Sequence, residues 1–227
     1  MPKLKPETEH ARRQHILDAA QRCFARGGFH RTSMQDICKE ASVSPGALYV
    51  YFDSKEALIA GICERDRAEL TVRLEKLAEA PDFMAALNAL GESYMVNDPA
   101  SKQRIVAEMG LESARNARVA EIFFGADQFC FAAFEGLFQR LKDEGRADPQ
   151  MDVKTIAKVF MLIGDGLYWR RAVMPDFDMR DVLPVLASMV GSLLRPVEPL
   201  RKLETIPTNS SAPGTVAAGQ NRKRARA

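Results

Sequence analysis

The stretch TSMQDICKEASVSPGALYVYFDSKEAL, residues 32–58, decides how this chain folds. It predicts two short helices that meet at a tight turn and are followed directly by the start of another helix. We expect Thr32 to cap the first helix, residues 33–40, because Gln35 stands at the capping-box spacing from it. Ser44 is expected to cap the second helix, and Pro45 suits its first position because an N–H there would have no partner.

The second helix, residues 45–51, is expected to present small and aromatic side chains outward. Leu48 and Phe52 are expected to be buried, which leaves five residues near the surface: Gly46, Ala47, Tyr49, Val50 and Tyr51. Two short helices joined in this way form a helix-turn-helix, and its second helix is the candidate for a DNA major groove. That helix carries no arginine or asparagine for bidentate base recognition. Specificity is therefore expected to depend on DNA shape and on methyl contacts.

The run SVSPGALYVYFDSKEAL, residues 42–58, resembles the signature of the TetR family of transcriptional regulators. Upstream, the segments ILDAA (16–20), Phe24, GGF (27–29) and TSM (32–34) resemble the family's first helix and the loop after it. The resemblance covers about the first sixty residues of the chain. Val50 and Tyr51 depart from it, since many members have a tyrosine and a histidine there. This departure affects DNA contacts and not the fold.

The resemblance implies DNA contacts from both helices of the motif. Ser44 and the two tyrosines are expected at phosphates, and the small residues near base edges or thymine methyl groups. Lys55 lies in the first turn of the following helix, where free N–H groups and the helix dipole favour a phosphate. The alternative is that Tyr49 and Tyr51 only pack the core of the motif. The predicted DNA-binding residues are Thr32, Ser33, Ser44, Pro45, Gly46, Ala47, Tyr49, Val50, Tyr51 and Lys55.

The charge of the 227-residue chain is unevenly distributed, although its net value is only +2. Residues 1–55 hold nine Lys/Arg against six Asp/Glu, and residues 197–227 hold six against two, so the segment between them is acidic. Such polarity is expected of a protein whose one end meets phosphates. The apolar runs fall short of the ~20 residues of a membrane span, and the polar N-terminus is not a secretory signal. We therefore expect a cytoplasmic protein with no membrane partner.

The cysteines and the missing catalytic motifs limit the chemistry that the chain is expected to perform. Cys23, Cys38, Cys63 and Cys130 show no CxxC spacing and are expected to be small buried apolar residues. A metal-binding or redox-sensing pair is the alternative for them. The sequence contains no HExxH, no nucleophile elbow and no phosphate-binding glycine loop. We expect no enzyme activity, no metal and no cofactor.

Helical periodicity without strand alternation predicts an all-α fold. The expected helices cover residues 9–26, 33–40, 45–51, 54–78, 81–97, 101–116, 117–144, 152–174 and 178–194. We predict a flexible arm at residues 1–8, a helix-turn-helix DNA-binding domain at 9–53, a ligand-binding and dimerisation domain at 54–195, and a disordered basic tail at 196–227. The basic end of the tail is expected to be solvated; the alternative is added attraction to DNA or another polyanion.

Aromatic and methionine side chains are frequent after residue 80, and an all-α core by itself accounts for many of them. They occur on more than one face of the helix 117–144, which exceeds what one core requires. The resemblance implies that these helices enclose a cavity for a lipophilic inducer. The predicted ligand-binding residues are Tyr94, Met109, Glu112, Phe123, Phe131, Phe134 and Trp169.

The last two predicted helices carry apolar faces interrupted by small residues, which allow helices to approach closely. The resemblance implies that they pair with the same helices of a second copy; packing within one chain is the alternative. A two-fold dimer is also what a palindromic operator requires. The predicted dimerisation residues are Phe160, Gly164, Leu167, Leu183, Leu186 and Val190.

Together these features predict a ligand-responsive dimeric repressor. Its partners would be double-stranded operator DNA with a palindromic sequence, a small lipophilic inducer and a second copy of the chain. Control of an efflux operon is our preferred role. The alternatives are a metabolic operon, since GDGLYWRRAV (164–173) faintly resembles the choline-response branch, and a helical interaction protein that binds no operator.

Overall fold

The computed structural model describes residues 6–98, 100–174 and 176–197, and within these ranges it contains helices and no strand, which confirms the predicted all-α class. A π-helical turn, Ser93–Asn97, and a 3-10 turn, Met179–Asp181, complete the helical elements. The α-helices are α1 Pro6–Arg31, α2 Met34–Glu40, α3 Pro45–Tyr51, α4 Lys55–Glu79, α5 Phe83–Glu92, α6 Ala100–Ser113, α7 Ala117–Asp143, α8 Val153–Val173 and α9 Leu183–Leu194.

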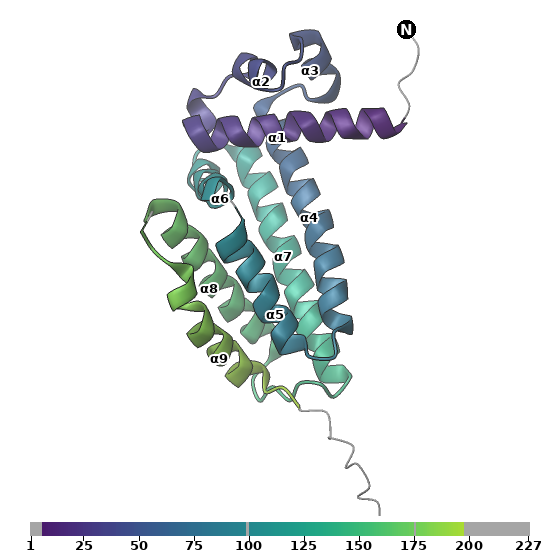
Figure 1. Cartoon of the computed structure of the whole chain (residues 1–227), viewed down its shortest axis with the longest axis vertical. Coiled ribbons are helices and arrows are strands. Elements are labelled where there is room, and N and C mark those ends of the chain that lie inside the picture. Colours follow the sequence, from purple (N-terminus) through teal and green to yellow (C-terminus); the bar gives the residue numbers. More distant parts are fainter. Residues whose placement is uncertain (1–5, 99, 175, 198–227) are drawn as a thin grey trace, which may run out of the picture.

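The helices form two parts, which we name the N-terminal unit (α1–α3) and the body (α4–α9). Helix α1 lies across the upper ends of α4 and α7, and α2 and α3 lie on the side of α1 that faces away from the body (Figure 1). The long helices α4 and α7 run side by side down the body, with α5, α8 and α9 beside them. This arrangement presents α3 at one extremity of the molecule.

The core of the N-terminal unit continues into the top of the body. Leu17, Leu48 and Ile37 are fully buried, and they belong to one apolar cluster with residues of α4, α6 and α7. The members from the body are Leu58, Ile59, Ile62, Ile105, Met109 and Val119. Burial of apolar surface therefore packs α4 and α6 directly against the N-terminal unit.

A second apolar cluster fills the body. Phe138 is fully buried, and the ring of Phe160 lies 5.5 Å from its ring and 4.6 Å from the ring of Phe134. Leu141, Ile156 and Leu194 from three different helices are also buried there. These contacts hold α7, α8 and α9 together.

The first helix is longer at both ends than the predicted range 9–26. Since α1 starts at Pro6, the flexible arm predicted for residues 1–8 is wrong for residues 6–8, and residues 1–5 lie outside the described residues. Gly28 interrupts the helix with φ 75° and ψ 167°, a conformation that residues with a Cβ rarely adopt. The last turn, up to Arg31, is thereby redirected toward α2.

The predicted cap of the next helix is wrong by one residue. Ser33, and not Thr32, caps α2: its Oγ accepts a hydrogen bond from the N–H of Asp36 (3.2 Å). The carboxylate of Asp36 accepts in return from the N–H of Ser33 (2.9 Å), so that Asp36 takes the place predicted for Gln35. The Thr32 hydroxyl instead donates to the carbonyl oxygens of Cys23 (3.2 Å) and Gly28 (2.8 Å), because it is buried against α1.

The helices of the body lie close to their predicted places, with two differences. The helix predicted for residues 81–97 is α-helical only to Glu92 and ends in the π-helical turn. The helix predicted for residues 178–194 is divided into the 3-10 turn and α9, which starts at Leu183. Gly145, with φ 68°, follows the end of α7, where glycine adopts the left-handed conformation without strain.

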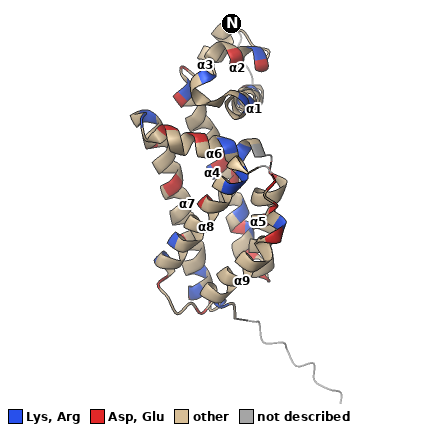
Figure 2. Cartoon of the chain, turned by 90° about the vertical axis from the view of Figure 1, so that its left-hand side faces the viewer, with Lys and Arg blue, Asp and Glu red and all other residues tan. Residues whose placement is uncertain are grey.

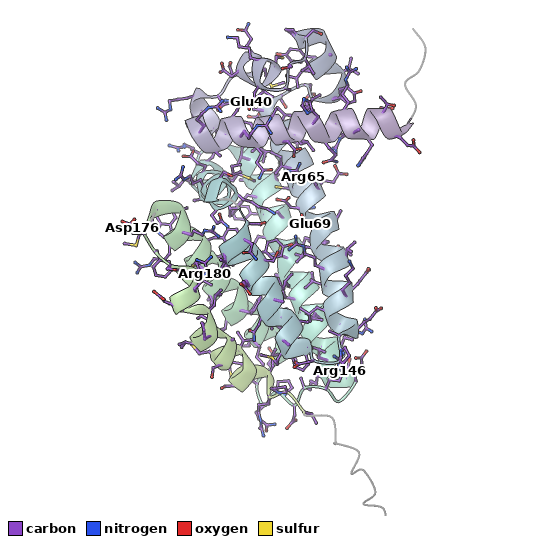
Figure 3. The ribbon with its side chains drawn as sticks, viewed as in Figure 1. Glu40, Arg65, Glu69, Arg146, Asp176 and Arg180 are labelled. Atoms are coloured by element: carbon purple, nitrogen blue, oxygen red, sulfur yellow. The ribbon has the colours of Figure 1, made fainter. Side chains whose placement is uncertain are left out.

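The end of the described chain returns to the loop between α7 and α8. The N–H of Val197 donates to the carbonyl oxygen of Arg146 (2.9 Å), and the Arg146 side chain donates to the carbonyl oxygens of Ala78 and Ala80 at the lower end of the body (Figure 3). The predicted tail therefore begins later than residue 196, and residues 198–227 lie outside the described residues. None of the helices described here is both long and apolar enough to cross a membrane.

Candidate DNA-binding surface and ligand-binding body

The helix α3 is fixed from both ends by the residues that predicted it. Ser44 caps it by accepting from the N–H of Ala47 (3.2 Å), and Pro45 occupies its first position. At its other end the N–H of Phe52 donates to the carbonyl oxygen of Leu48 (3.0 Å), and both side chains are buried. The predicted bounds, cap and buried face of this helix are confirmed.

The outward face of α3 consists of small residues flanked by larger exposed ones. A Cβ placed on Gly46 would meet no atom within 4 Å, so a surface can approach the backbone closely here. Tyr49 is 53% exposed and Val50 is 79% exposed, whereas Tyr51 is half-buried against the core of the unit. Tyr49 is thus available to a partner. The alternative that a tyrosine only packs the core of the motif fits Tyr51 better than Tyr49.

The residues that precede α3 differ in what they offer to DNA. Ser33 is exposed at the beginning of α2, next to free N–H groups of the first turn. The Thr32 side chain is buried, and its hydroxyl is engaged with α1, so its side chain does not reach a phosphate in this structure. Thr32 positions the turn between α1 and α2.

Lys55 occupies a different place from the phosphate contact that we predicted. Its Nζ donates to the carbonyl oxygen of Phe29 (2.6 Å) and lies 4.3 Å from the centre of the Phe29 ring. The ammonium group thus satisfies a carbonyl at the end of α1 and makes a cation–π contact. In this structure Lys55 joins α4 to α1.

Basic side chains gather at the junction of α1 and α2. Arg22 and Arg26 both form ion pairs with Glu40, at 2.7 Å and 3.0 Å, which fixes α2 on α1. An open cavity of about 430 Å³ lies beside this pair and is lined by Cys23, Arg26, Gly27, Arg31, Thr32, Asp36, Lys39 and Glu40. Lys39 is exposed at this cavity, and sequence reasoning did not single it out.

The predicted ligand-binding residues do not share one site. Met109 is buried in the cluster that joins the N-terminal unit to the body, and Phe123 packs against it. Phe131 and Phe134 pack against the second cluster, in the body. Trp169 is 48% exposed on α8. The described structure brings only part of the predicted set into the interior of the body.

Tyr94 lies at the centre of a polar region inside the body. The Arg73 guanidinium carbon is 4.6 Å and the Lys102 Nζ is 5.3 Å from the centre of its ring, and burial raises the pKa of its hydroxyl to about 12. Gln103 is fully buried and donates from Nε2 to the carbonyl oxygen of Tyr94 (2.9 Å), while its Oε1 has no hydrogen-bond partner among the described residues.

A half-buried arginine, Arg67, adds to this polar character. The Arg67 guanidinium carbon lies 5.6 Å from the centre of the Phe129 ring, and its Nε is buried without a hydrogen-bond partner among the described residues. Arg67 and Gln103 were missed by sequence reasoning, since nothing in a helical sequence distinguishes a buried polar side chain from a solvated one.

An open cavity of about 330 Å³ lies where the π-helical turn meets the segment between α8 and α9. Arg171, Asp176 and Arg180 are among the residues that line it, and the last two are labelled in Figure 3. The Arg171 side chain donates to the carbonyl oxygens of Val96 (2.9 Å) and Asp98 (2.8 Å). None of the seven predicted ligand-binding residues lines this cavity.

Glu112 lies at the junction of the two parts, away from the polar region that surrounds Tyr94. Its carboxylate is buried and accepts from the Nε2 of His30 (2.6 Å) and the Nε of Arg115 (3.0 Å). Burial alone would raise the pKa of this carboxyl group, but the hydrogen bonds and charges of Arg115 and His30 hold it below its ordinary value. The predicted role of Glu112 as a polar anchor for a ligand does not fit this placement.

The predicted dimerisation residues are covered to different degrees by their own chain, and Phe160 is half-buried whereas Val190 is buried. Val190 is buried within the body, and Phe160 packs on Phe134 and Phe138. Gly191 approaches α5, since a Cβ on it would lie 3.4 Å from Met84. The side chains of Leu167, Leu183 and Leu186 are half-buried, as is Gly164.

The exposed apolar residues of α8 and α9 lie on different faces from those predicted. On α8, Leu162 is 70% and Trp169 is 48% exposed, and they are two helical turns apart. On α9, Val185 and Met189 are exposed one turn apart. Helix α9 carries no charged residue and is drawn without charge colours in Figure 2. We name these four residues the α8–α9 stripe.

The N-terminal unit matches a known sequence profile. Residues 16–62 match that of bacterial regulatory proteins of the tetR family. Over 184 residues the chain is 30% identical to YfiR of Bacillus subtilis, an uncharacterized HTH-type transcriptional regulator, and this match covers 80% of the chain and 89% of YfiR. The chain belongs to the TetR family. It is accordingly a transcriptional regulator and not an enzyme, as the sequence predicted.

Other members of the TetR family support this assignment along most of the chain. UidR of Escherichia coli, an HTH-type transcriptional regulator, is 28% identical over 193 residues, which cover 80% of this chain and 92% of UidR. The structure of GusR from Salmonella enterica superposes with a TM-score of 0.68 at 28% identity, covering 82% of this chain and 96% of GusR. SmeT in complex with triclosan has the same fold, with a TM-score of 0.65 at 22% identity, and the match covers 93% of this chain and 100% of SmeT.

Proposed function

We propose that this TetR-family regulator is a dimeric repressor that binds a palindromic operator and releases it when a small lipophilic inducer binds to the body. The observation that carries the proposal is the outward face of α3, where Gly46 and Ala47 leave the backbone approachable between the capping Ser44 and the exposed Tyr49. A narrow helix of this kind fits a major groove.

The DNA contacts proposed for this surface follow from exposure. Ser33, Ser44 and Tyr49 carry hydroxyl groups that suit phosphates, while Gly46, Ala47 and Val50 suit base edges and thymine methyl groups. Pro45 belongs to the same surface through its exposed ring. Tyr51 and Thr32 support this surface from within the unit, and Lys55 supports it from the start of α4. Lys55 contacts a phosphate only if it leaves the Phe29 carbonyl.

The dimer is proposed to form through the α8–α9 stripe. Large exposed apolar residues at helical spacing on two adjacent helices mark an interaction surface. Two copies related by a two-fold axis would then present two α3 helices to two half-sites of a palindrome. Leu162→Glu is expected to convert the dimer to a monomer in analytical ultracentrifugation, whereas Val72→Glu on α4, also an exposed apolar position, is expected to leave the dimer intact.

The inducer is proposed to bind among the aromatic side chains of the body and to alter the angle of α4. Binding can release the operator only if the inducer has a higher affinity for the arrangement in which the two N-terminal units no longer fit successive grooves. Triclosan in the SmeT structure and stearoyl-CoA in the Bacillus subtilis FadR structure are ligands of proteins that share this fold, with TM-scores of 0.65 for both. Control of an efflux operon is the role that suits a lipophilic inducer.

A specific observation favours a second candidate, the control of a metabolic operon. The buried Gln103 Oε1 and Arg67 Nε lack partners within the described residues, and a polar metabolite could supply them. Two observations separate these roles. One is the function of the genes that adjoin the regulator. The other is whether lipophilic drugs or polar metabolites raise its thermal unfolding midpoint.

The operator claim is tested by fluorescence anisotropy with the DNA upstream of the chain's own gene. Tyr49→Ala is expected to weaken binding about tenfold, since it removes a phosphate contact. The control is Val72→Ala, which truncates an exposed side chain on α4 and is expected to bind as the wild type does. Equal affinity of the wild type for this DNA and for a random duplex would contradict the proposal.

A further inference from the structure

The first turns of α1 are helical although they contribute nothing to the core. Residues 7–12 are all exposed, and the apolar cluster of the N-terminal unit begins only at Ile16. This end of α1 projects beyond the body (Figure 1). Because a helical segment of this length gains little stability from its own hydrogen bonds, packing gives no reason for extending α1 so far. We name residues 7–12 the α1 extension.

One face of the α1 extension is directed away from the body. Arg12 precedes His15 by three positions and Cys23 by eleven, so these side chains lie on the same side of the helix. The Nε2 of His15 lies 2.9 Å from the carbonyl oxygen of Ala41, and the Sγ of Cys23 lies 3.9 Å from that of Asp36. Both oxygens belong to α2 and its cap. Arg12 is therefore on the face of α1 that carries α2, which is the side away from the body (Figure 1).

The next residue, Arg13, shows how close this part of α1 lies to α3. Its guanidinium carbon is 5.2 Å from the centre of the Phe52 ring, and Phe52 follows α3 directly. Its Nη2 lies 2.8 Å from the Glu64 carboxylate of α4, so Arg13 is engaged with the body. Arg12 is turned from Arg13 by about 100° around the helix axis. It therefore lies near the C-terminal end of α3 without taking part in the contact with α4.

Arg12 differs from the other arginines of the N-terminal unit in having no protein partner. The arginines that bind a carboxylate or a backbone oxygen are Arg13, Arg22, Arg26 and Arg31. Arg12 is exposed, and no ion pair or hydrogen bond between described residues involves its side chain. A guanidinium in this state can bind an oxyanion without first breaking a contact, and its fork of N–H groups matches the geometry of a phosphate.

The acidic side chains of the α1 extension lie to either side of this face. Thr8 stands four positions before Arg12 and seven before His15, so it shares their face. Glu7 and Glu9 are each about 100° from Thr8 around the axis. The face that points away from the body thus presents a hydroxyl and a guanidinium, two groups that donate hydrogen bonds to phosphate oxygens.

We propose that the α1 extension is a second DNA-contacting element, in which Arg12 binds a backbone phosphate beside the groove that α3 enters, with Thr8 next to it. The inference rests on the proposed function, since α3 has to lie in the groove for this face of α1 to meet the backbone. The contact adds affinity and salt dependence but no base specificity, because it is made to a phosphate.

The first experiment measures the affinity of the full chain for its upstream DNA by fluorescence anisotropy. In Arg12→Ala the slope of log affinity against log salt should fall by about one unit, so that the affinity lost between about 50 and 200 mM salt is about threefold smaller than in the wild type. Arg12→Lys keeps the charge and should keep the wild-type slope. The matched control is Lys142→Ala, which removes an exposed cation near the end of α7 and should bind as the wild type does. The thermal unfolding midpoint of Arg12→Ala should equal that of the wild type, since the side chain is exposed.

The second experiment locates the contact by hydroxyl-radical footprinting at saturating protein. Arg12→Ala should lose protection at one edge of each half-site and keep it in the middle, where α3 binds. A wild-type salt slope together with an unchanged footprint in Arg12→Ala would overturn the second element and leave the proposed function intact.

The two failures can be told apart because a phosphate contact does not depend on base sequence. If the wild type shows no preference for its upstream DNA, the proposed function fails, and the salt slopes of the wild type and Arg12→Ala on a random duplex still decide the role of Arg12. A wild type that binds no duplex at all would contradict both.

Discussion

The N-terminal unit and the body use helices for opposite purposes. In the unit, short helices bury Leu48 and Phe52 and turn a few small or polar residues outward, so that its surface depends on individual side chains. In the body, long helices bury large aromatic side chains such as Phe138. The difference teaches that the unit is distinguished by the few side chains it exposes, whereas the body is distinguished by the aromatic core it buries.

The largest expected effect is the loss of a core aromatic side chain from the body. Phe138 is fully buried and packs on Phe134 and Phe160, so Phe138→Ala should lower the free energy of unfolding by about 3–5 kcal/mol. Chemical denaturation monitored by circular dichroism measures this change. The control is Phe124→Ala, where the side chain is 59% exposed and the expected change is about 0.5 kcal/mol or less. Similar losses in both variants would contradict the packing described for the body.

A glycine at the junction should be the next most sensitive position. Gly28 has φ 75°, and a Cβ on it would lie 3.2 Å from the Glu108 carboxylate, so Gly28→Ala should destabilise the protein by about 1–3 kcal/mol. Gly136→Ala is the contrasting variant, since Gly136 is in α7 with no atom near a Cβ, and it should stabilise the protein by about 0.5–1 kcal/mol. The measurement is the denaturant midpoint of each variant. If both midpoints shifted in the same direction from the wild type, the turn at Gly28 would be misplaced.

The sequence predicts the unit more closely than the sites of the body, and particular residues show why. Ser44, Pro45 and Phe52 act within one helix, so local rules suffice to place α3. Thr32 and Ser33 are both able to cap α2, and the choice between them depends on the carbonyl oxygens of Cys23 and Gly28, which only the tertiary structure brings near.

The dimerisation face of the body is harder to predict for the same reason, at longer range. Phe160 and Val190 lie on apolar helix faces, but a helical pattern does not reveal whether such a face meets its own chain or a second copy. The stripe that is exposed, with Leu162 and Met189, is offset from them. The contact between His30 and Glu112 likewise has no local signal, because it joins residues that are distant in the sequence.

A smaller effect concerns Lys55, and it tests whether this residue belongs to the contact between the two parts or to the DNA-binding surface. Lys55→Ala removes the hydrogen bond to the Phe29 carbonyl and the contact with its ring, so the protein should lose about 1–2 kcal/mol of stability. If Lys55 stays on α1 in the complex, the slope of log affinity against log salt should not change. A slope reduced by about one unit would instead show that the lysine moves to a phosphate on binding.

The smallest effect concerns the capping box at the start of α2. Hydrogen bonds from the Ser33 side chain and backbone lower the pKa of Asp36, so its contribution to stability is present above its ordinary pKa and is lost as the pH falls. Stability of the wild type should therefore decline more steeply below pH about 4 than that of Ser33→Ala. If the stability of the two proteins fell equally as the pH was lowered, the result would argue against the capping box.

The central claim is that a dimer presents α3 twice to DNA. Hydroxyl-radical footprinting of the wild type on its own upstream DNA, combined with the stoichiometry of the complex from sedimentation, tests it most directly. We predict two protected half-sites related by two-fold symmetry and separated by about one helical turn, or a multiple of it, with an even number of chains per site. Protection of one asymmetric segment by a monomer, or no protection at all, would contradict the account.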